Sequence, residues 1–392
     1  MSWENVKLED LCVSITDGDH QSLPLTEEGI PFIVIADINS NNRIEFGNAR
    51  YVPYDYYEKL DEKRKARKGD VLLTVKGSFG IPVYVADNNP FVFQRDIAIL
   101  KCNERINPRF LYYYMKNREF YRYTDSIAIG AAQRAITLKS LRNTTIKLPS
   151  LDIQQKIVDL LSPYDDLIEN NQKQIKLLEE AAQRLYKEWF VDLRFPSHET
   201  TPITDGIPEG WGAKTLTDIA SVIMGQSPKS EFYNQEGKGL PFHQGVGSYG
   251  TRFVIDNTYS TSYTRIAEAG SILFSVRAPV GRLNMTKNKV VIGRGLAAIN
   301  HRAGKQSYLF YLLKERFFKD DIIGNGAIFA SISKDELLGQ KFLIPNDELV
   351  TRFDTVVSDM DKKIADLADQ IALLTEARDR LLPKLMNGEI EV

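Results

Sequence analysis

Cysteine and histidine are scarce in this chain. Its 392 residues include two cysteines, Cys12 and Cys102, which have neither close spacing in the sequence nor neighbouring histidines. This pattern argues against a disulfide framework and a zinc knuckle, and it fits a reducing cytoplasm. The four histidines are scattered, without the HxxxH or HExxH spacing that brings two imidazoles to one metal ion. We therefore expect no metal site.

Long apolar runs are missing as well. The first ten residues, MSWENVKLED, carry charges where a secretory signal needs an apolar run, and no stretch approaches the ~18 apolar residues of a membrane-spanning helix. The chain is nevertheless 43% hydrophobic and 10% aromatic, which is typical of folded proteins and not of disordered ones. Its length suits two domains with connecting elements. We expect a soluble, cytoplasmic protein.

Familiar catalytic motifs are also absent. There is no Walker loop, GxSxG elbow or GxGxxG fingerprint, and the run TDGDH at 16–20 lacks the further ligands of a calcium loop. The run NNPF at 88–91 is similar to the Asn-Pro-Pro-aromatic tetrad with which amino-methyltransferases hold a flipped base. It has only one proline, and no glycine-rich AdoMet loop precedes it. A turn followed by a strand explains it better, so we expect no catalysis by this chain alone.

The net charge of −2 is the sum of unlike segments. Residues 1–150 carry a net charge of +2 and residues 197–346 carry +4, whereas residues 151–196 carry −3 and residues 347–392 carry −5. Two mildly basic blocks thus alternate with two acidic blocks. The balance over the whole chain hides two possible anion-binding units.

The chain contains one unit of about 196 residues twice. GAAQRAITLKSLRNTTIKLP at 130–149 matches GAIFASISKDELLGQKFLIP at 326–345, with an offset of 196. KGDVLLTVKGSFG, which ends at Gly80, matches AGSILFSVRAPVG, which ends at Gly281, and RFLYYYMKN at 109–117 matches SYLFYLLKE at 307–315. Two copies are too few for a solenoid, in which stacked units bury one another's faces.

Each copy ends in a long heptad pattern. Apolar residues recur at alternating steps of four and three, and the two patterns stand in the same register at the offset of 196. The seam of the first pattern contains Ile157, Leu161, Tyr164, Ile168, Asn171, Ile175, Leu178, Ala182, Leu185 and Trp189. The seam of the second contains Phe353, Met360, Ile364, Leu367, Ile371, Leu374 and Leu381.

These two helices could pack separately on their own domains or pair with each other. A narrow seam sustained over more than four heptads favours pairing. Two tandem copies related by a pseudo-twofold axis would make the pair antiparallel and place the globular parts at opposite ends. Asn171 and Arg378 interrupt the seam, and such polar residues commonly fix register. Pro163 predicts a kink or a short break in the first helix.

The globular parts mix short strand-like runs with one strongly helical segment each, at 107–121 and 305–318. The predicted fold class is therefore α+β: two similar mixed domains separated by two long antiparallel helices that form a coiled coil, with a pseudo-twofold internal repeat. The expected boundaries are 1–149 for the first globular domain, 150–195 for the first helical arm, 196–210 for a linker, 211–345 for the second globular domain and 346–392 for the second arm.

The whole chain resembles the specificity (S) subunits of type I restriction-modification systems. LPSLDIQQKIVDLLSPYDDLIENNQKQIKLLEEAAQRLYKEWF is similar to that family's first conserved helical region, and GIPEGWGAKTLTDIA resembles the entry into its second target-recognition domain. GQSPKSEFYNQEGKGLPFHQG and ITDGDHQSLP resemble phrases of its target-recognition domains. The second helical region departs from the pattern, because DELVTRF stands where a Gln pair is expected.

The resemblance implies a non-catalytic subunit that recognises double-stranded DNA. Each globular domain would be a target-recognition domain that reads one half of an asymmetric bipartite site. The helical pair would set the spacer and dock two methylation (M) subunits and the restriction (R) subunits. The S subunit itself would carry no cofactor, since AdoMet is bound by the M subunits, and ATP and Mg by the R subunits.

Residues that read bases should be polar side chains on loops beside strands, because these carry the groups that match base edges. Lys76 aligns with Arg277 at a strand end before a turn, where a solvated strand end is the alternative. Arg95 aligns with Arg294 inside an otherwise apolar strand, where a structural hydrogen-bonding arginine is the alternative. Further candidates are Ser78, Gln133 and Arg134 in the first copy, and His20, Gln21, Gln226, Lys229 and Gln244 in the family-like phrases.

Gln133 and Arg134 stand where the second copy has Phe329 and Ala330, so the frame repeats while the loop tips diverge. The aromatic run at 112–114 is expected in the core. Two alternatives from other classes remain: a coiled-coil scaffold that binds proteins and not DNA, and a self-contained adenine methyltransferase, which the missing AdoMet loop disfavours.

Overall fold

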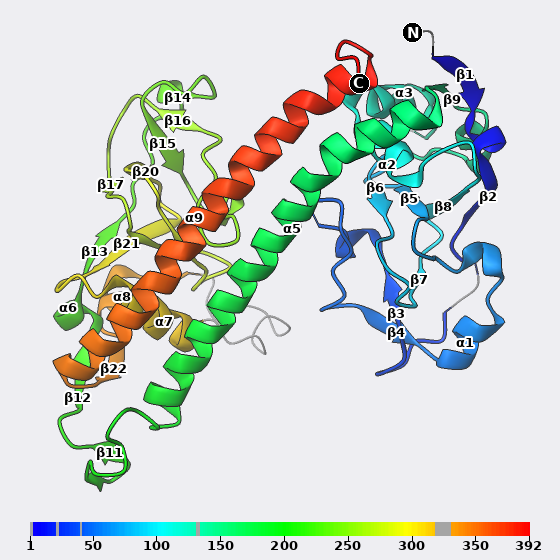
Figure 1. Ribbon diagram of the computed structural model, residues 1–392. Coiled ribbons are helices and arrows are strands. Elements are labelled where there is room, and N and C mark those ends of the chain that lie inside the picture. The colour runs from blue at the N-terminus through cyan, green and yellow to red at the C-terminus, as the bar shows by residue number, and fades with distance from the viewer. Residues whose placement is uncertain (1–2, 21–22, 40, 131–133, 318–330) are drawn as a thin grey trace. The chain divides into compact units, whose positions relative to one another are not determined.

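The computed structural model describes residues 3–20, 23–39, 41–130, 134–317 and 331–392. Its contacts divide the chain into two compact units. Unit 1 contains residues up to 170 together with 370–392, and unit 2 contains residues 171–369. Both units mix helices and sheets, so the α+β class is confirmed (Figure 1). The domain boundaries given above remain predictions.

Unit 1 is built around a four-stranded antiparallel sheet in the order β2-β8-β5-β6. Its strands are β2 (Cys12–Asp17), β8 (Ile97–Cys102), β5 (Val71–Thr74) and β6 (Pro82–Tyr84). A second sheet has the order β4-β3-β7, with β4 (Arg50–Val52), β3 (Ile30–Ile33) and β7 (Val92–Phe93). β1 (Glu4–Lys7) pairs with β9 (Thr145–Leu148). The short helices are α1 (Tyr54–Lys59), α2 (Pro108–Lys116), α3 (Arg118–Ile127) and α4 (Leu138–Arg142).

Unit 2 has the same kind of central sheet, in the order β13-β21-β18-β19. Its strands are β13 (Ala220–Met224), β21 (Leu296–His301), β18 (Ile272–Ser275) and β19 (Leu283–Met285). The second sheet contains β14 (Tyr233–Asn234), β16 (Tyr259–Ser260), β15 (Leu240–His243), β20 (Val290–Ile292) and β17 (Ile266–Ala267). β12 (Gly212–Thr215) pairs with β22 (Lys341–Ile344), and β10 (Ile203–Thr204) pairs with β11 (Ile207–Pro208). The short helices are α6 (Leu216–Ile219), α7 (Gln306–Phe317) and α8 (Lys334–Leu338).

Two long helices, α5 (Leu151–Tyr186) and α9 (Asp347–Met386), each contribute to both units. In unit 1, Ile157 and Leu161 near the start of α5 share a buried cluster with Leu382 and Leu385 near the end of α9. In unit 2, the end of α5 and the start of α9 share a buried cluster that contains Ala182, Tyr186, Phe353 and Val357. Within each unit the two helices therefore run side by side in opposite directions (Figure 1).

Pro163 lies inside α5, and the helix continues through it, so the structure has no break there. A short π-helical segment, Lys187–Val191, follows α5 directly. A proline in a helix removes one backbone hydrogen bond, and the packing of a 36-residue helix tolerates that loss here.

The seam residues of the predicted pattern face inward to different degrees. Half-buried members are Leu178, Leu185, Met360, Ile371, Leu374 and Leu381. Buried members are Ile157, Leu161, Ile168, Asn171, Ile175, Phe353, Ile364, Leu367 and Arg378. The pattern also contained Tyr164, which is half-buried, whereas the adjacent Asp165 is buried.

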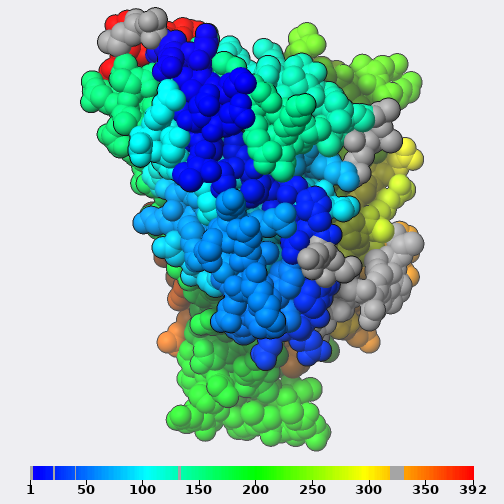
Figure 2. Space-filling model, turned by 90° about the vertical axis from the view of Figure 1, so that its right-hand side faces the viewer, coloured from blue at the N-terminus to red at the C-terminus, as the bar shows by residue number. Residues whose placement is uncertain are grey.

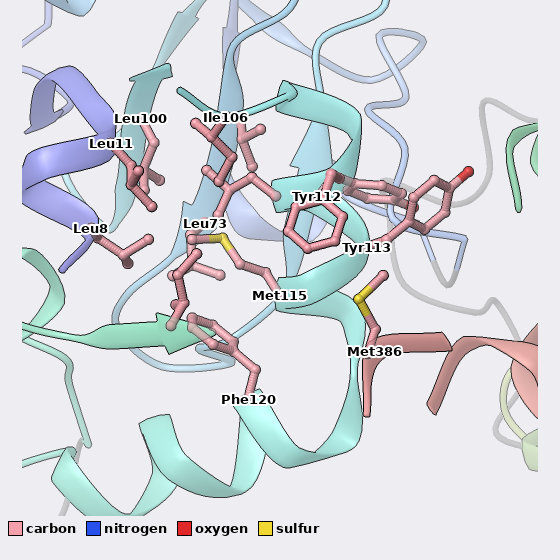
Figure 3. Close-up of a cluster of buried hydrophobic side chains, with 14 of the residues drawn as sticks. Leu8, Leu11, Leu73, Leu100, Ile106, Tyr112, Tyr113, Met115, Phe120 and Met386 are labelled. Carbon is pink, nitrogen blue, oxygen red and sulfur yellow. The ribbon is translucent and has the colours of Figure 1, made fainter. Parts of the chain in front are cut away.

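The core of unit 1 lies between its central sheet and α2. Tyr112, Tyr113 and Met115 of α2 are buried in one apolar cluster with Leu73 and Leu100 of the sheet, and Met115 points toward Leu73 (Figure 3). The aromatic run at 112–114 therefore belongs to the core, as expected. In Figure 2 the N-terminal strands of unit 1 (dark blue) lie on the face that is turned to the viewer.

Cys12 and Cys102 are distant in the sequence but are directly opposite each other in the β2–β8 pair, and both are free thiols. A hydrogen bond with Cys12 and burial raise the pKa of the Cys102 thiol. Along the described part of the chain, no helix has both the length and the apolar character needed to cross a bilayer.

Candidate nucleic-acid interface

In unit 2 a tight turn, Gly293-Arg294-Gly295, connects β20 to β21, and three other segments meet it. The amide of Val276, at the end of β18, donates to the Gly295 carbonyl at 2.9 Å. The amide of Gly225, after β13, donates to the Leu296 carbonyl at 2.9 Å, and the Gly295 amide donates to the Gln244 carbonyl at 3.1 Å. Strand ends of the central sheet and of the second sheet of unit 2 thus meet at this turn.

Glycine is required where these backbones cross. A Cβ on Gly225 would lie 2.1 Å from the Gly293 carbonyl oxygen, and a Cβ on Gly295 would lie 2.4 Å from the Gln244 carbonyl oxygen. Neither distance is possible for a real side chain. Close packing of glycine backbones leaves Arg294 as the one side chain that projects from the turn, and it is exposed. The backbone amide of Arg294 donates a hydrogen bond to the Ser227 hydroxyl at 3.2 Å.

Four of the five candidates in unit 2 lie on these converging segments. Gln226, Gln244, Arg277 and Arg294 are all exposed, and each is at or next to a backbone hydrogen bond of the crossing. Lys229 is also exposed, but it lies three residues beyond Gln226, and its ammonium group is 3.9 Å from Glu231. The backbone therefore groups a guanidinium pair with two carboxamides, which together can donate to and accept from base edges.

Unit 1 repeats this crossing around the turn Gln94-Arg95-Asp96, between β7 and β8. The amide of Val75 donates to the Asp96 carbonyl at 2.8 Å, and the amide of Gly18 donates to the Ile97 carbonyl at 3.3 Å. Arg95 and Ser78 are exposed and Lys76 is half-buried. Val75 and Asp96 are therefore in contact, and Arg95 and Lys76 are their neighbours in the chain.

The loop before α4 joins the crossing in unit 1. Lys76 forms an antiparallel bridge with Ala135, and the Gly77 amide donates to the Arg134 carbonyl at 3.3 Å. In unit 2, Arg277 forms the equivalent bridge with Ser331. The repeated stretch that contains Arg134 is therefore brought against Lys76, and its counterpart is brought against Arg277.

The placement of Arg95 and Arg294 inside apolar strands is wrong. Each arginine occupies an exposed turn, and β8 and β21 begin only after these turns. Within the described residues, neither guanidinium group has a hydrogen bond or an ion pair. Apolar residues on both sides of each turn made the two short strands resemble one long strand.

The remaining candidates of unit 1 differ in their surroundings. His20 lies at the edge of the crossing, with its Nε2 3.0 Å from Asp17. Arg134 is held locally, because its Nη1 lies 2.5 Å from Asp125 and its guanidinium carbon lies 5.7 Å from the Phe79 ring centre. Its side chain would have to leave Asp125 to reach a ligand. Gln21, Gln133, Gly326, Phe329 and Ala330 lie outside the residues that the structure describes.

A buried histidine supports the segment that carries Gln244, and sequence patterns did not single it out for this role. The His243 side chain is fully buried, with Nδ1 2.8 Å from the Ser248 hydroxyl and Nε2 3.1 Å from Asp256. Both ring nitrogens are thus engaged directly before the exposed Gln244. His243 fixes the backbone from which Gln244 projects, and Gly225 and Ser227 fix the neighbouring segment.

Acidic groups distinguish the crossing of unit 1 from that of unit 2. Asp96 of the first turn stands where unit 2 has Gly295, and Asp19 lies beside Gln94. The Asp19 carboxylate accepts from the Tyr56 hydroxyl at 2.7 Å and pairs with Arg64 at 3.0 Å. Burial and the neighbouring Asp19 raise the pKa of Tyr56. Over the described residues, no group of three or more His, Cys, Asp or Glu side chains is arranged to hold a metal ion.

Comparison with known proteins gives a consistent result. A family model described as "Type I restriction modification DNA specificity domain" matches residues 1–180 and 208–380. The chain is 27% identical to the MjaIX specificity subunit of a type I restriction enzyme from Methanocaldococcus jannaschii, over 100% of this chain and 94% of that protein. It is 24% identical to the HindI specificity subunit of Haemophilus influenzae, over 99% of both chains.

One solved structure shares the fold. The S subunit of a type I restriction-modification system from M. genitalium aligns with a TM-score of 0.61 at 18% identity, over 98% of this chain and 96% of that chain.

Proposed function

The chain belongs to the family of type I restriction-modification specificity subunits, and from this premise we propose that it recognises a bipartite DNA sequence. Specificity subunits are the non-catalytic recognition component of these systems, so the chain is not itself an enzyme. In the proposal, each unit presents one target-recognition domain to one half of an asymmetric site. The two domains correspond to residues 1–149 and 211–345.

The observation that carries this proposal is the pair of exposed arginine turns. Arg95 and Arg294 project from equivalent crossings, and their side chains have no partner among the described residues, which leaves both guanidinium groups available to guanine edges or phosphates. Lys76 and Arg277 lie at the adjoining strand ends. Because Asp96 and His20 accompany the first turn, while Gln226 and Gln244 accompany the second, the two half-sites should differ in sequence.

The two long helices would act as a spacer. In the proposal α5 and α9 form one antiparallel coiled coil about a pseudo-twofold axis, with helical regions at 150–195 and 346–392 and a linker at 196–210. Support comes from the apolar packing of α5 against α9 within each unit and from the buried seam positions. A seam from Ile157 to Trp189 rises roughly 50 Å at ~1.5 Å per residue. At ~3.4 Å per base step, this length corresponds to somewhat more than one turn of duplex.

The outer faces of the helices would dock the methylation and restriction subunits. Leucines are exposed there although they lie in the middle of regular helices: Leu160 is 47% exposed, Leu167 49%, Leu177 64% and Leu373 66%. Apolar side chains in such positions commonly mark protein contacts. In this assembly AdoMet would be bound by the M subunits, and ATP and Mg by the R subunits, within the cytoplasm.

The test is a filter-binding selection of the chain, in complex with its M partner, against a randomised duplex library. We expect enrichment of one asymmetric motif in two parts with a fixed gap. If no bipartite motif is enriched, the DNA-recognition proposal fails, and a protein-binding scaffold becomes the better hypothesis. AdoMet turnover by the chain alone would point to a self-contained methyltransferase.

A further inference from the structure

Two carboxylates occupy equivalent places on the long helices. Asp165 of α5 and Asp361 of α9 are separated by the repeat offset of 196 residues. Both are largely removed from solvent, with side-chain exposures of 8% and 15%. Buried carboxylates are rare in helices unless they are paired, so each must be compensated locally.

In unit 1, Asp165 connects three helices. Its carboxylate accepts from Nη1 of Arg378 on α9 at 2.6 Å and from the Tyr113 hydroxyl of α2 at 2.9 Å. The ammonium group of Lys116, also on α2, is 3.6 Å away, and burial lowers its pKa to about 8. One acid of the first arm is therefore tied both to the second arm and to the main helix of the globular domain.

In unit 2, Asp361 makes the equivalent connection with different partners. It accepts from the Ser307 hydroxyl of α7 at 2.6 Å and from Nη2 of Arg252 at 2.5 Å. Arg252 is 3% exposed, its guanidinium carbon lies 3.5 Å from the Phe310 ring centre, and Nη1 is 3.9 Å from Glu179 of α5. Here too the globular domain and both long helices meet at one buried charge cluster.

The cation of the two clusters comes from different parts of the chain, from α9 in unit 1 and from the globular domain in unit 2. The position equivalent to Arg378 is Ala182, which is fully buried and carries no charge. Unit 2 instead takes its cation from Arg252, in the connection between β15 and β16 of the globular domain. In unit 1 the comparable connection, between β3 and β4, supplies Arg43, which pairs with Glu169 of α5 at 3.2 Å. The location of the acid is thus kept while its partners change.

Such charge clusters restrict movement of a globular domain along its helical arm more than apolar packing does. A globular domain that moved along the arm by one residue, about 1.5 Å, would still bury its apolar face. It would nevertheless separate the carboxylate from its donors and leave a buried charge unpaired, and buried polar groups of this kind are known to fix helix register. Each cluster therefore defines one position of its domain on the arm.

We propose that Asp165 and Asp361 are positioning residues that hold each recognition domain at one place along its arm and thereby set the spacer length that the protein accepts. This inference rests on the proposed recognition of a bipartite DNA site. The two acids do not contact DNA in this scheme. Their loss should alter the tolerated gap between the half-sites and leave the bases preferred within each half unchanged.

The experiment compares Asp165→Asn and Asp361→Asn with the wild type, each as the full chain in complex with its M partner. A control is Asp359→Asn, which alters an exposed acid of α9 that pairs with Lys362 of its own helix. Duplexes carry the selected half-sites with the selected gap, or with one or two base pairs more or fewer. Competition binding then gives the ratio of affinities for the selected gap and its neighbours.

We expect the two isosteric variants to lower this ratio at least three-fold while half-site base preferences stay the same, and we expect the control to keep the wild-type ratio. An unchanged ratio in folded variants would overturn the proposal and leave the clusters with a purely structural role. Should either variant fail to fold, Tyr113→Phe and Ser307→Ala remove one hydrogen bond each; they should shift the ratio in the same direction, and no shift would overturn the proposal. A wild type that selects no bipartite motif would overturn the proposed function and this inference together.

Discussion

Replacement of Arg252 by alanine should destabilise unit 2 strongly, and the loss should depend on pH. Arg252 is the cation shared by Asp361, at 2.5 Å, and Glu179, at 3.9 Å. Breaking a buried pair from one side commonly costs ~3–5 kcal/mol, and a desolvated cation over an aromatic ring contributes about 2 kcal/mol. These terms overlap, so we expect a loss of ~3–5 kcal/mol in the free energy of unfolding at pH 8.

The sign of the pH dependence follows from the two carboxyl groups. Burial raises the pKa of Asp361 and of Glu179, and Arg252 works against both increases. An acid whose pKa is raised in the folded state costs stability above that pKa, and the cost disappears as the pH falls through it. Without Arg252 both pKa values should rise further. The deficit of the variant should therefore be smaller at pH 5 than at pH 8.

The assay is urea unfolding of the full chain followed by tryptophan fluorescence. Two of the three tryptophans, Trp189 and Trp211, lie in unit 2, and replacing Trp3 by phenylalanine removes the signal from unit 1. Arg265→Ala is the matched control, because Arg265 is an exposed arginine of the same unit, and its loss should cost less than ~0.5 kcal/mol. If the loss in the free energy of unfolding were equal at pH 5 and pH 8, Arg252 would not be the cation that holds down the pKa values of Asp361 and Glu179.

Three further outcomes test the recognition surface and the docking faces. Arg277→Ala should reduce base discrimination in one half-site only, by ~1–3 kcal/mol of binding free energy if the guanidinium makes a bidentate base contact. An equal loss of affinity for all sequences in the binding selection would indicate a phosphate contact. Gly295→Ala should weaken binding of one half-site at least ten-fold, because the added Cβ would lie 2.4 Å from the Gln244 carbonyl oxygen; Gly47→Ala, with nothing within 4 Å, should bind normally. Leu177→Ser should reduce co-purification of the M partner and leave the thermal midpoint of the chain within about 2 °C, since this side chain is 64% exposed.

The repeat made much of the architecture predictable. An offset of 196 residues aligned the two copies and the two heptad patterns, and it already placed Asp165 and Asp361 at equivalent positions. Helical periodicity depends on neighbours within a few residues, so it survives in the sequence. The buried face departs from the predicted seam by one residue at two places, where Asp165 is buried next to the half-buried Tyr164 and Leu382 is buried next to the half-buried Leu381.

The recognition surface was harder to predict because non-local backbone contacts create it. The run FVFQRDIAIL has the composition of one strand, and only the hydrogen bond from the Val75 amide to the Asp96 carbonyl defines the turn that exposes Arg95. Arg252 is 109 residues from Asp361 in the chain, and no spacing rule connects them. His243 was noted only as an isolated histidine, since Ser248 and Asp256 become its partners through the loop that follows β15.

Methylome sequencing of a host that carries this chain with its methylation partner tests the central claim most directly. We predict adenine methylation at one asymmetric motif whose two parts are separated by a gap of constant length. Expression of the Arg294→Ala variant in the same host should relax the base preference in one part of the motif and leave the other part and the gap unchanged. Methylation at a single continuous motif, or relaxation of both parts by this one substitution, would contradict the account.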